Sequence, residues 1–141
     1  MFLLDTNVVS ELRRPDKAER HVLEWAGRVP VASFFLSVVT LLELELGALR
    51  VARRDAAQGT VLRDWIDGQV LPRFEGRILP VDTAVAQECA RLHVPDPRAD
   101  RDALIAATAL VHGMTVTTRN VSDFEPMGVA VFNPWGIPSR P

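Results

Sequence analysis

Four acidic residues stand beside apolar segments that are spread over almost the whole chain. They are Asp5, Glu43, Asp102 and Asp123. Folding normally keeps carboxylates away from a core, so several at its edge indicate a cluster of oxygen ligands. Such a cluster suits a hard cation such as Mg²⁺ or Mn²⁺. A divalent ion held by carboxylates beside a parallel sheet is a common arrangement for hydrolysing phosphodiesters.

The size and composition of the chain fit an ordinary globular protein. With 141 residues, 48% of them hydrophobic and 24% charged, we expect one domain over residues 1–141. A single cysteine, Cys89, excludes an intrachain disulfide and a thiolate metal site. No apolar run is long enough for a membrane span and the N-terminus lacks the basic region of a signal peptide, so we expect a cytoplasmic protein. A net charge of −2 argues against a nucleic-acid-coating protein but not against a nuclease.

Apolar runs alternate with helical patterns along the chain. The runs predict strands over 2–4, 34–39, 77–81, 114–117 and 128–132. The patterns predict helices over 7–12, from a cap at Asp16 to about Gly27, over 40–54, 56–70, 83–92 and 100–112. Because the strand segments are continuously apolar, we expect burial on both faces. The sequence therefore predicts an α/β fold with a five-stranded parallel sheet between two layers of helices.

The predicted topology brings the four acids to one edge of this sheet. Sites in open α/β sheets lie beyond the carboxyl ends of the strands. Asp5 and Asp123 follow predicted strands, and Glu43 lies in the first turn of a helix that we expect to begin at Thr40. Asp102 opens a helix that runs antiparallel to the strands, so its N-terminal end faces the same edge.

Each acid also has a purely structural interpretation. Asp5 could cap the following helix, and Glu43 could form a capping box with Thr40. Asp100 competes with Asp102 for the role at its helix start, and Asp123 could cap a local turn. The joint position of the acids carries more weight than any one of them. No glycine-rich phosphate loop and no histidine pair at metal-ligand spacing offers another chemistry.

Four segments surround the four acids in a fixed order along the chain: Leu3–Leu12, Ser37–Leu44, Asp102–Ala109 and Thr117–Phe124. In this order they resemble the PIN-domain nucleases, in particular the bacterial VapC-type toxins and their FitB-like branch. The segment Val129–Trp135 also looks like the ending of that family. No single piece is specific, but the combination is, and it spans nearly the whole chain.

The resemblance implies a central groove that contains all four acids. It implies Asp5 and Asp102 as direct ligands of Mg²⁺ or Mn²⁺, with Glu43 and Asp123 completing the site directly or through water. One or two ions would activate a water, and RNA would be cut to leave 5′ phosphates and 3′ hydroxyls. The groups that would orient the ligands or the substrate are Thr6, Asn7 and Asn120.

The resemblance also implies a biological context. Such proteins are toxins of type II toxin–antitoxin systems, endoribonucleases that a cognate antitoxin inhibits by covering the groove. The resemblance implies contact with operator DNA only through the antitoxin and a homodimeric toxin, and the lack of a long apolar run implies that no membrane is involved. Transfer, ribosomal and messenger RNA all remain possible substrates.

Two other functions remain open. A phosphatase of the haloacid dehalogenase type also has an aspartate after its first strand, but it needs a second aspartate where this chain has Asn7. Alternatively, the protein is a non-catalytic subunit that completes a DNA-binding repressor complex with its partner. The complete set of acids argues against that second function.

Overall fold

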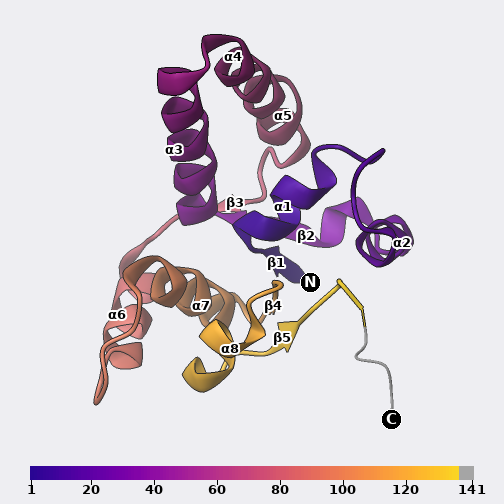
Figure 1. The fold of residues 1–141 in the computed structure, drawn as a ribbon. Helices are drawn as coiled ribbons and strands as arrows, with labels where there is room; N and C mark the ends of the chain where they lie inside the picture. Colours follow the sequence, from indigo (N-terminus) through magenta and orange to yellow (C-terminus); the bar gives the residue numbers. More distant parts are fainter. Residues whose placement is uncertain (137–141) are drawn as a thin grey trace.

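The computed structural model describes residues 1–136 and has a sheet of five short strands (Figure 1). The strands are β1 (Phe2–Leu4), β2 (Phe34–Ser37), β3 (Ile78–Leu79), β4 (Thr115–Thr117) and β5 (Val131–Phe132). Their order is β3-β2-β1-β4-β5, and every neighbouring pair is parallel. The predicted five-stranded parallel sheet is confirmed, with β1 at its centre.

Helices connect the strands and cover both faces of the sheet. They are α1 (Thr6–Leu12), α2 (Arg20–Arg28), α3 (Val38–Arg54), α4 (Ala56–Trp65), α5 (Leu71–Arg73), α6 (Thr83–Leu92), α7 (Asp100–His112) and α8 (Val121–Phe124). A π-helical turn, Ile66–Val70, joins α4 to α5. In Figure 1, α3, α4 and α5 form a hairpin that rises from one end of the sheet. Within residues 1–136, no helix combines the length and apolar character that crossing a membrane requires.

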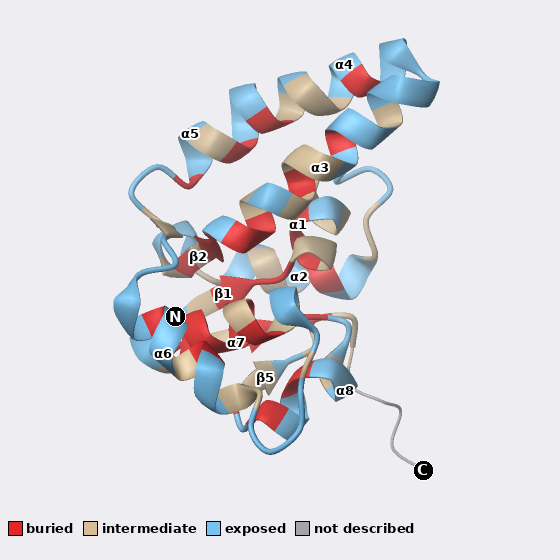
Figure 2. Cartoon of the chain, turned by 90° about the vertical axis from the view of Figure 1, so that its left-hand side faces the viewer, coloured by how far each residue is buried: buried red, intermediate tan, exposed pale blue. Residues whose placement is uncertain are grey.

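The sheet separates two hydrophobic cores. Successive β1 side chains point to opposite faces, as strand geometry requires. Leu3 packs with α6 and α7, and Leu4 packs with α1 and α3. Both leucines are at most 1% exposed, and Figure 2 shows the buried positions concentrated on β1 and on the helix faces turned toward it. The predicted three-layer arrangement is thereby confirmed.

The start of α3 differs from the prediction. The helix begins at Val38 because the Ser37 hydroxyl accepts a hydrogen bond from the backbone N–H of Val39 at 3.0 Å and caps it. The strand expected over 34–39 therefore ends at Ser37. Glu43 lies in the second turn of α3 rather than the first, so its interpretation as the partner of Thr40 in a capping box is wrong.

Two further boundaries also differ. Glu19, not Asp16, caps α2, because its carboxylate accepts from the backbone N–H of His21 at 2.7 Å and of Val22 at 3.3 Å. The last strand begins at Val131 instead of residue 128. Gly128 has a φ of 74° and ends a short 3₁₀ turn, so the chain becomes extended only after it.

A close contact between α3 and α4 depends on Gly59. A Cβ atom there would lie 2.4 Å from the Cβ and 2.5 Å from the Cα of Ala52. We expect Gly59→Ala to lower the free energy of unfolding by about 2 kcal/mol, because the two helix backbones must separate despite the better helix propensity of alanine.

Urea denaturation measures this effect. Gly47→Ala on α3 is the matched control, because a Cβ at Gly47 would meet nothing within 4 Å. The control should be as stable as the parent protein or slightly more stable. A Gly59→Ala protein that behaves like the control would contradict the described packing of the hairpin.

Candidate active site

Asp5 lies at the carboxyl end of β1 and is 6% exposed. Its Oδ1 accepts from the backbone N–H of Thr6 at 2.8 Å, so the expected capping of α1 is present. Its Oδ2 accepts from the Thr118 hydroxyl at 2.8 Å and from Asn7 Nδ2 at 3.3 Å. Burial raises the pKa of Asp5, the bonds from Thr118 and Thr6 oppose this, and the charges of Glu43 and Asp123 add to it. The fold therefore fixes a carboxylate where ionisation is costly.

Glu43 reaches the same edge from α3. Its Oε1 accepts from the Thr6 hydroxyl at 2.6 Å. Thr6 thus binds Asp5 through its backbone and Glu43 through its side chain. One residue at the start of α1 holds two carboxylates from distant parts of the sequence.

Asp102 and Asp123 approach the site from α7 and α8. The pKa of Asp102 is raised to about 6, first by burial and then by the negative charges of Asp5, Asp123 and Glu43. This mutual repulsion means that the four predicted acids occupy one region of the molecule. They come from the end of β1 and from three different helices, so only the tertiary fold brings them together.

The ligand atoms of the site are of the type that divalent cations prefer, but the four side chains are not close together. All four candidates offer hard carboxylate oxygens, which Mg²⁺ and Mn²⁺ prefer, and a cation would relieve their repulsion. Within residues 1–136, however, no three acidic, histidine or cysteine side chains converge closely enough to hold a metal ion as they stand.

A network of polar groups supports Asp5. Asn7 Nδ2 also lies 3.3 Å from the Thr118 hydroxyl oxygen, and its Oδ1 accepts from the backbone N–H of Arg119 at 3.2 Å. The backbone N–H of Asn120 donates to the Thr118 hydroxyl at 3.0 Å. Asn7 therefore contacts the acid directly, whereas Asn120 reaches it through its backbone and Thr118.

The sequence analysis did not identify Thr118. This residue is fully buried, and its hydroxyl links the ends of β1 and β4. Its neighbour Thr117 pairs with Leu4 in the sheet. A parallel pairing of these two strands would have placed Thr118 beside Asp5, but the sequence pattern alone does not specify which strands are neighbours.

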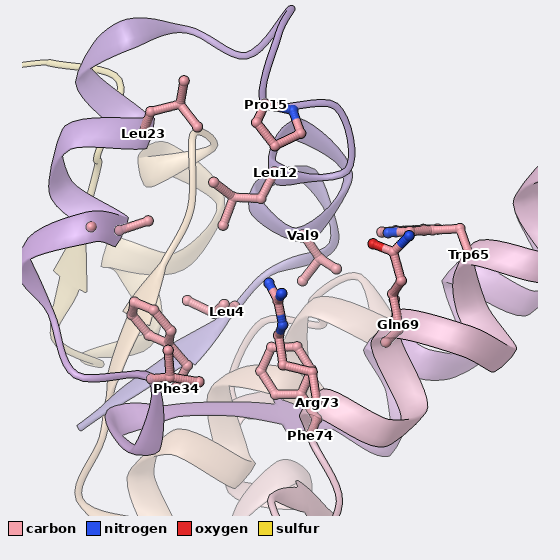
Figure 3. Close-up of a pocket in the computed structure, with 14 residues that line it drawn as sticks. Leu4, Val9, Leu12, Pro15, Leu23, Phe34, Trp65, Gln69, Arg73 and Phe74 are labelled. Atoms are coloured by element: carbon pink, nitrogen blue, oxygen red, sulfur yellow. The ribbon is translucent and has the colours of Figure 1, made fainter.

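A separate apolar cavity of about 310 Å³ lies between α1, α2 and α5 (Figure 3). Its apolar walls include Leu4, Val9, Leu12, Leu23, Phe34 and Phe74. Figure 3 shows Trp65 and Gln69 along one side and the Arg73 side chain rising in the middle of the view. None of the four acids lines this cavity. It is suited to apolar side chains rather than to the chemistry of the acids.

Comparison with known proteins identifies the family. The PIN domain family matches residues 2–125. Toxin FitB of Neisseria gonorrhoeae is 40% identical over 141 residues, which cover 96% of this chain and 99% of that protein. VapC ribonuclease Y4jK of Sinorhizobium fredii is 36% identical over 140 residues, with 96% and 98% coverage.

Solved structures agree with this assignment. The crystal structure of FitAcB from Neisseria gonorrhoeae has a chain with a TM-score of 0.88 and 38% identity, covering 97% of this chain and all of that one. The structure of FitAB bound to an IR36 DNA fragment gives a TM-score of 0.87 and 37% identity, with both chains fully covered. The chain therefore belongs to the PIN domain family, and its resemblance to the VapC- and FitB-like toxins is confirmed.

Proposed function

We propose that this protein is the toxin of a type II toxin–antitoxin system and that it acts as a metal-dependent endoribonuclease. The observation that carries the proposal is the meeting of four carboxylates at the carboxyl edge of a PIN-domain sheet. Its relatives are named as a toxin and as a ribonuclease over nearly their whole length. Family membership removes the phosphatase alternative.

We assign Asp5 and Asp102 as direct ligands of the metal ion, with Glu43 and Asp123 completing the site. A bound Mg²⁺ or Mn²⁺ would lower the pKa of an attacking water and stabilise negative charge on the phosphate. The protein brings the four ligands to one edge of the sheet. Thr118 and Asn7 orient Asp5, and Thr6 orients Glu43.

The hydroxyl and amide groups that bond to Asp5 and Glu43 limit how far these carboxylates can move. Because Thr6 contacts both Asp5 and Glu43, a shift of one carboxylate is transmitted to the other. We propose that Asn120 orients the substrate, since this residue follows β4 at the same edge of the sheet. Water would attack the phosphorus and displace the 3′ oxygen, which leaves a 5′ phosphate and a 3′ hydroxyl.

We further propose a cognate antitoxin that brings the protein to operator DNA. The solved complex FitAB bound to DNA supports this arrangement. Besides the groove of the acids, we assign the apolar cavity between α1, α2 and α5 to the antitoxin, because its apolar walls suit the side chains of a protein partner.

We also propose a homodimer of the toxin. Leu42 and Leu49 on α3 are 52% and 61% exposed and provide apolar surface outside the cavity. Light scattering of the isolated protein should give the mass of two chains. The mass of one chain would contradict this part of the proposal.

Total RNA incubated with partner-free protein tests the activity. With Mg²⁺ or Mn²⁺ we expect discrete fragments, and with EDTA or in the Asp5→Asn protein we expect none. Metal binding without cleavage would favour the alternative in which the protein only completes a repressor complex. Cleavage that persists in EDTA would contradict the proposed chemistry.

The raised pKa of Asp102 predicts how stability depends on pH. Its pKa moves from an ordinary value of 3.8 to about 6, so the folded protein binds this proton more tightly than the unfolded chain. The stabilisation is fully present below the ordinary pKa and is lost as the pH rises through about 6. Asp5 shifts in the same direction. We therefore expect the metal-free protein to become less stable over this range.

Added metal should reverse the loss. Mn²⁺ should raise the melting temperature at about pH 7.5 and have little effect below about pH 5, because protonated carboxyl groups do not bind it. Thermal denaturation in Mn²⁺ and in EDTA measures the difference. An equal rise at both pH values, or no rise at either, would contradict the assignment of Asp5 and Asp102 as ligands.

A further inference from the structure

Arg101 lies beside the acidic site. It precedes Asp102 in the first turn of α7, and its Nη1 lies 3.8 Å from Oε2 of Glu43 on α3. The two helices belong to layers on opposite faces of the sheet. The other oxygen of Glu43 is occupied by Thr6, so the carboxylate is held between a hydroxyl and a guanidinium.

The contact between Arg101 and Glu43 contributes little to the stability of the fold. Its distance is near the limit for an ion pair, and the Arg101 side chain is 47% exposed. Exposed ion pairs contribute little to folding. In the described part of the chain, this is the one ion pair of Arg101. Most of the five N–H donors of the guanidinium therefore remain available at the rim of the site.

An RNA phosphate needs a cation at this position. Four ionised carboxylates carry four negative charges, and one divalent ion offsets half of them. With a single ion bound, a phosphodiester that approaches the acids is therefore still repelled. A guanidinium offers paired donors that match the oxygens of a phosphate. The neighbouring Arg119 is differently engaged, since its guanidinium lies 5.3 Å from the centre of the Trp135 ring.

We infer that Arg101 is a substrate-binding residue that holds a backbone phosphate of single-stranded RNA beside the four acids. This inference rests on the proposed ribonuclease function. In the protein without RNA, the guanidinium faces Glu43. When metal and RNA are bound, it exchanges this contact for the phosphate and leaves Glu43 available to the metal ion. Arg101 thus links the freeing of the Glu43 carboxylate to the binding of the RNA phosphate.

RNA binding without cleavage tests this inference. Fluorescence anisotropy with a labelled single-stranded RNA would compare wild type with Arg101→Gln in Ca²⁺, a hard divalent ion that also binds carboxylates, in place of Mg²⁺. We expect affinity to fall roughly tenfold at low salt, and the slope of log affinity against log salt to decrease by about 0.7, the value for one phosphate contact on a single strand. Arg101→Lys should restore part of the affinity and the slope.

Arg20→Gln is the matched control. It removes the same charge from α2, where the Arg20 side chain is 79% exposed and pairs with Glu24 at 3.6 Å. It should change affinity and slope little. In the cleavage-competent protein, Arg101→Gln should raise KM more than it lowers kcat, because a binding contact is lost.

Two results would overturn the inference. Unchanged RNA affinity and salt slope, together with tighter Mn²⁺ binding, would mean that Arg101 only neutralises Glu43. No measurable affinity of the wild-type protein for RNA in Ca²⁺ would also contradict it. Cleavage by the wild-type protein, measured in parallel, separates a failure of this inference from a failure of the proposed ribonuclease function. If wild type cleaves RNA and Arg101→Gln binds normally, only this inference fails, whereas absence of wild-type cleavage overturns the proposed function as well.

Discussion

Asp102→Asn should reduce RNA cleavage by at least about a thousandfold, because an amide is a much poorer ligand for a hard divalent cation than a carboxylate. The same substitution should stabilise the metal-free protein. At neutral pH the Asp102 carboxylate is disfavoured by burial and by three other acids, and asparagine removes that charge without changing the side-chain size. We expect a gain of about 1 kcal/mol, since water that still reaches the group screens part of the repulsion.

The opposite signs of the two effects make this prediction specific. Cleavage rates and urea denaturation in EDTA would be measured on the same preparation. A general folding defect would lower both activity and stability. If the variant keeps its activity, Asp102 is not a metal ligand. If the variant is less stable without metal, repulsion among the four acids does not destabilise the protein.

Gly27→Phe should prevent inhibition by the antitoxin while leaving RNA cleavage intact. Gly27 lines the apolar cavity, and a Cβ there would meet nothing within 4 Å. A side chain at this position can therefore start into the cavity without a clash at its Cβ atom, and a phenyl ring there would occupy the space assigned to the partner. We expect the affinity for the antitoxin to fall about a hundredfold, the effect of losing a central contact in an interface.

Titration of cleavage with the antitoxin measures this loss. Val61→Phe adds a ring of the same kind on α4, where Val61 is 48% exposed and does not line the cavity. This control should be inhibited like the parent protein. Equal inhibition of both variants would place the antitoxin elsewhere. Loss of cleavage in Gly27→Phe would mean that the cavity and the acids are mechanically coupled.

The sequence was most informative where burial alone determines the structure. Continuous apolar runs indicate strands covered on both faces, and this property predicted a parallel sheet between helices. The same topology explains why acids that follow strands or open helices meet at one edge. Thus Asp5, Glu43, Asp102 and Asp123 could be grouped before any contact was known.

The supporting contacts could not be predicted because they join residues far apart in the chain. The hydroxyl of Thr118 bonds to Asp5 across 113 positions, and that of Thr6 bonds to Glu43 across 37. Local patterns do not encode such pairs. A competing local bond also changed the outcome at α3, where Ser37 provided a cap and moved the helix start by two residues.

The chemistry of the product ends tests the central claim most directly. A defined single-stranded RNA would be cut by the purified protein in Mg²⁺ and in EDTA, and the new termini would be identified by mass spectrometry. Water-driven hydrolysis at the four acids predicts 5′ phosphates and 3′ hydroxyls in Mg²⁺ and no products in EDTA. Products with 2′,3′-cyclic phosphates, or cleavage that survives EDTA, would contradict a metal-dependent site formed by Asp5, Glu43, Asp102 and Asp123.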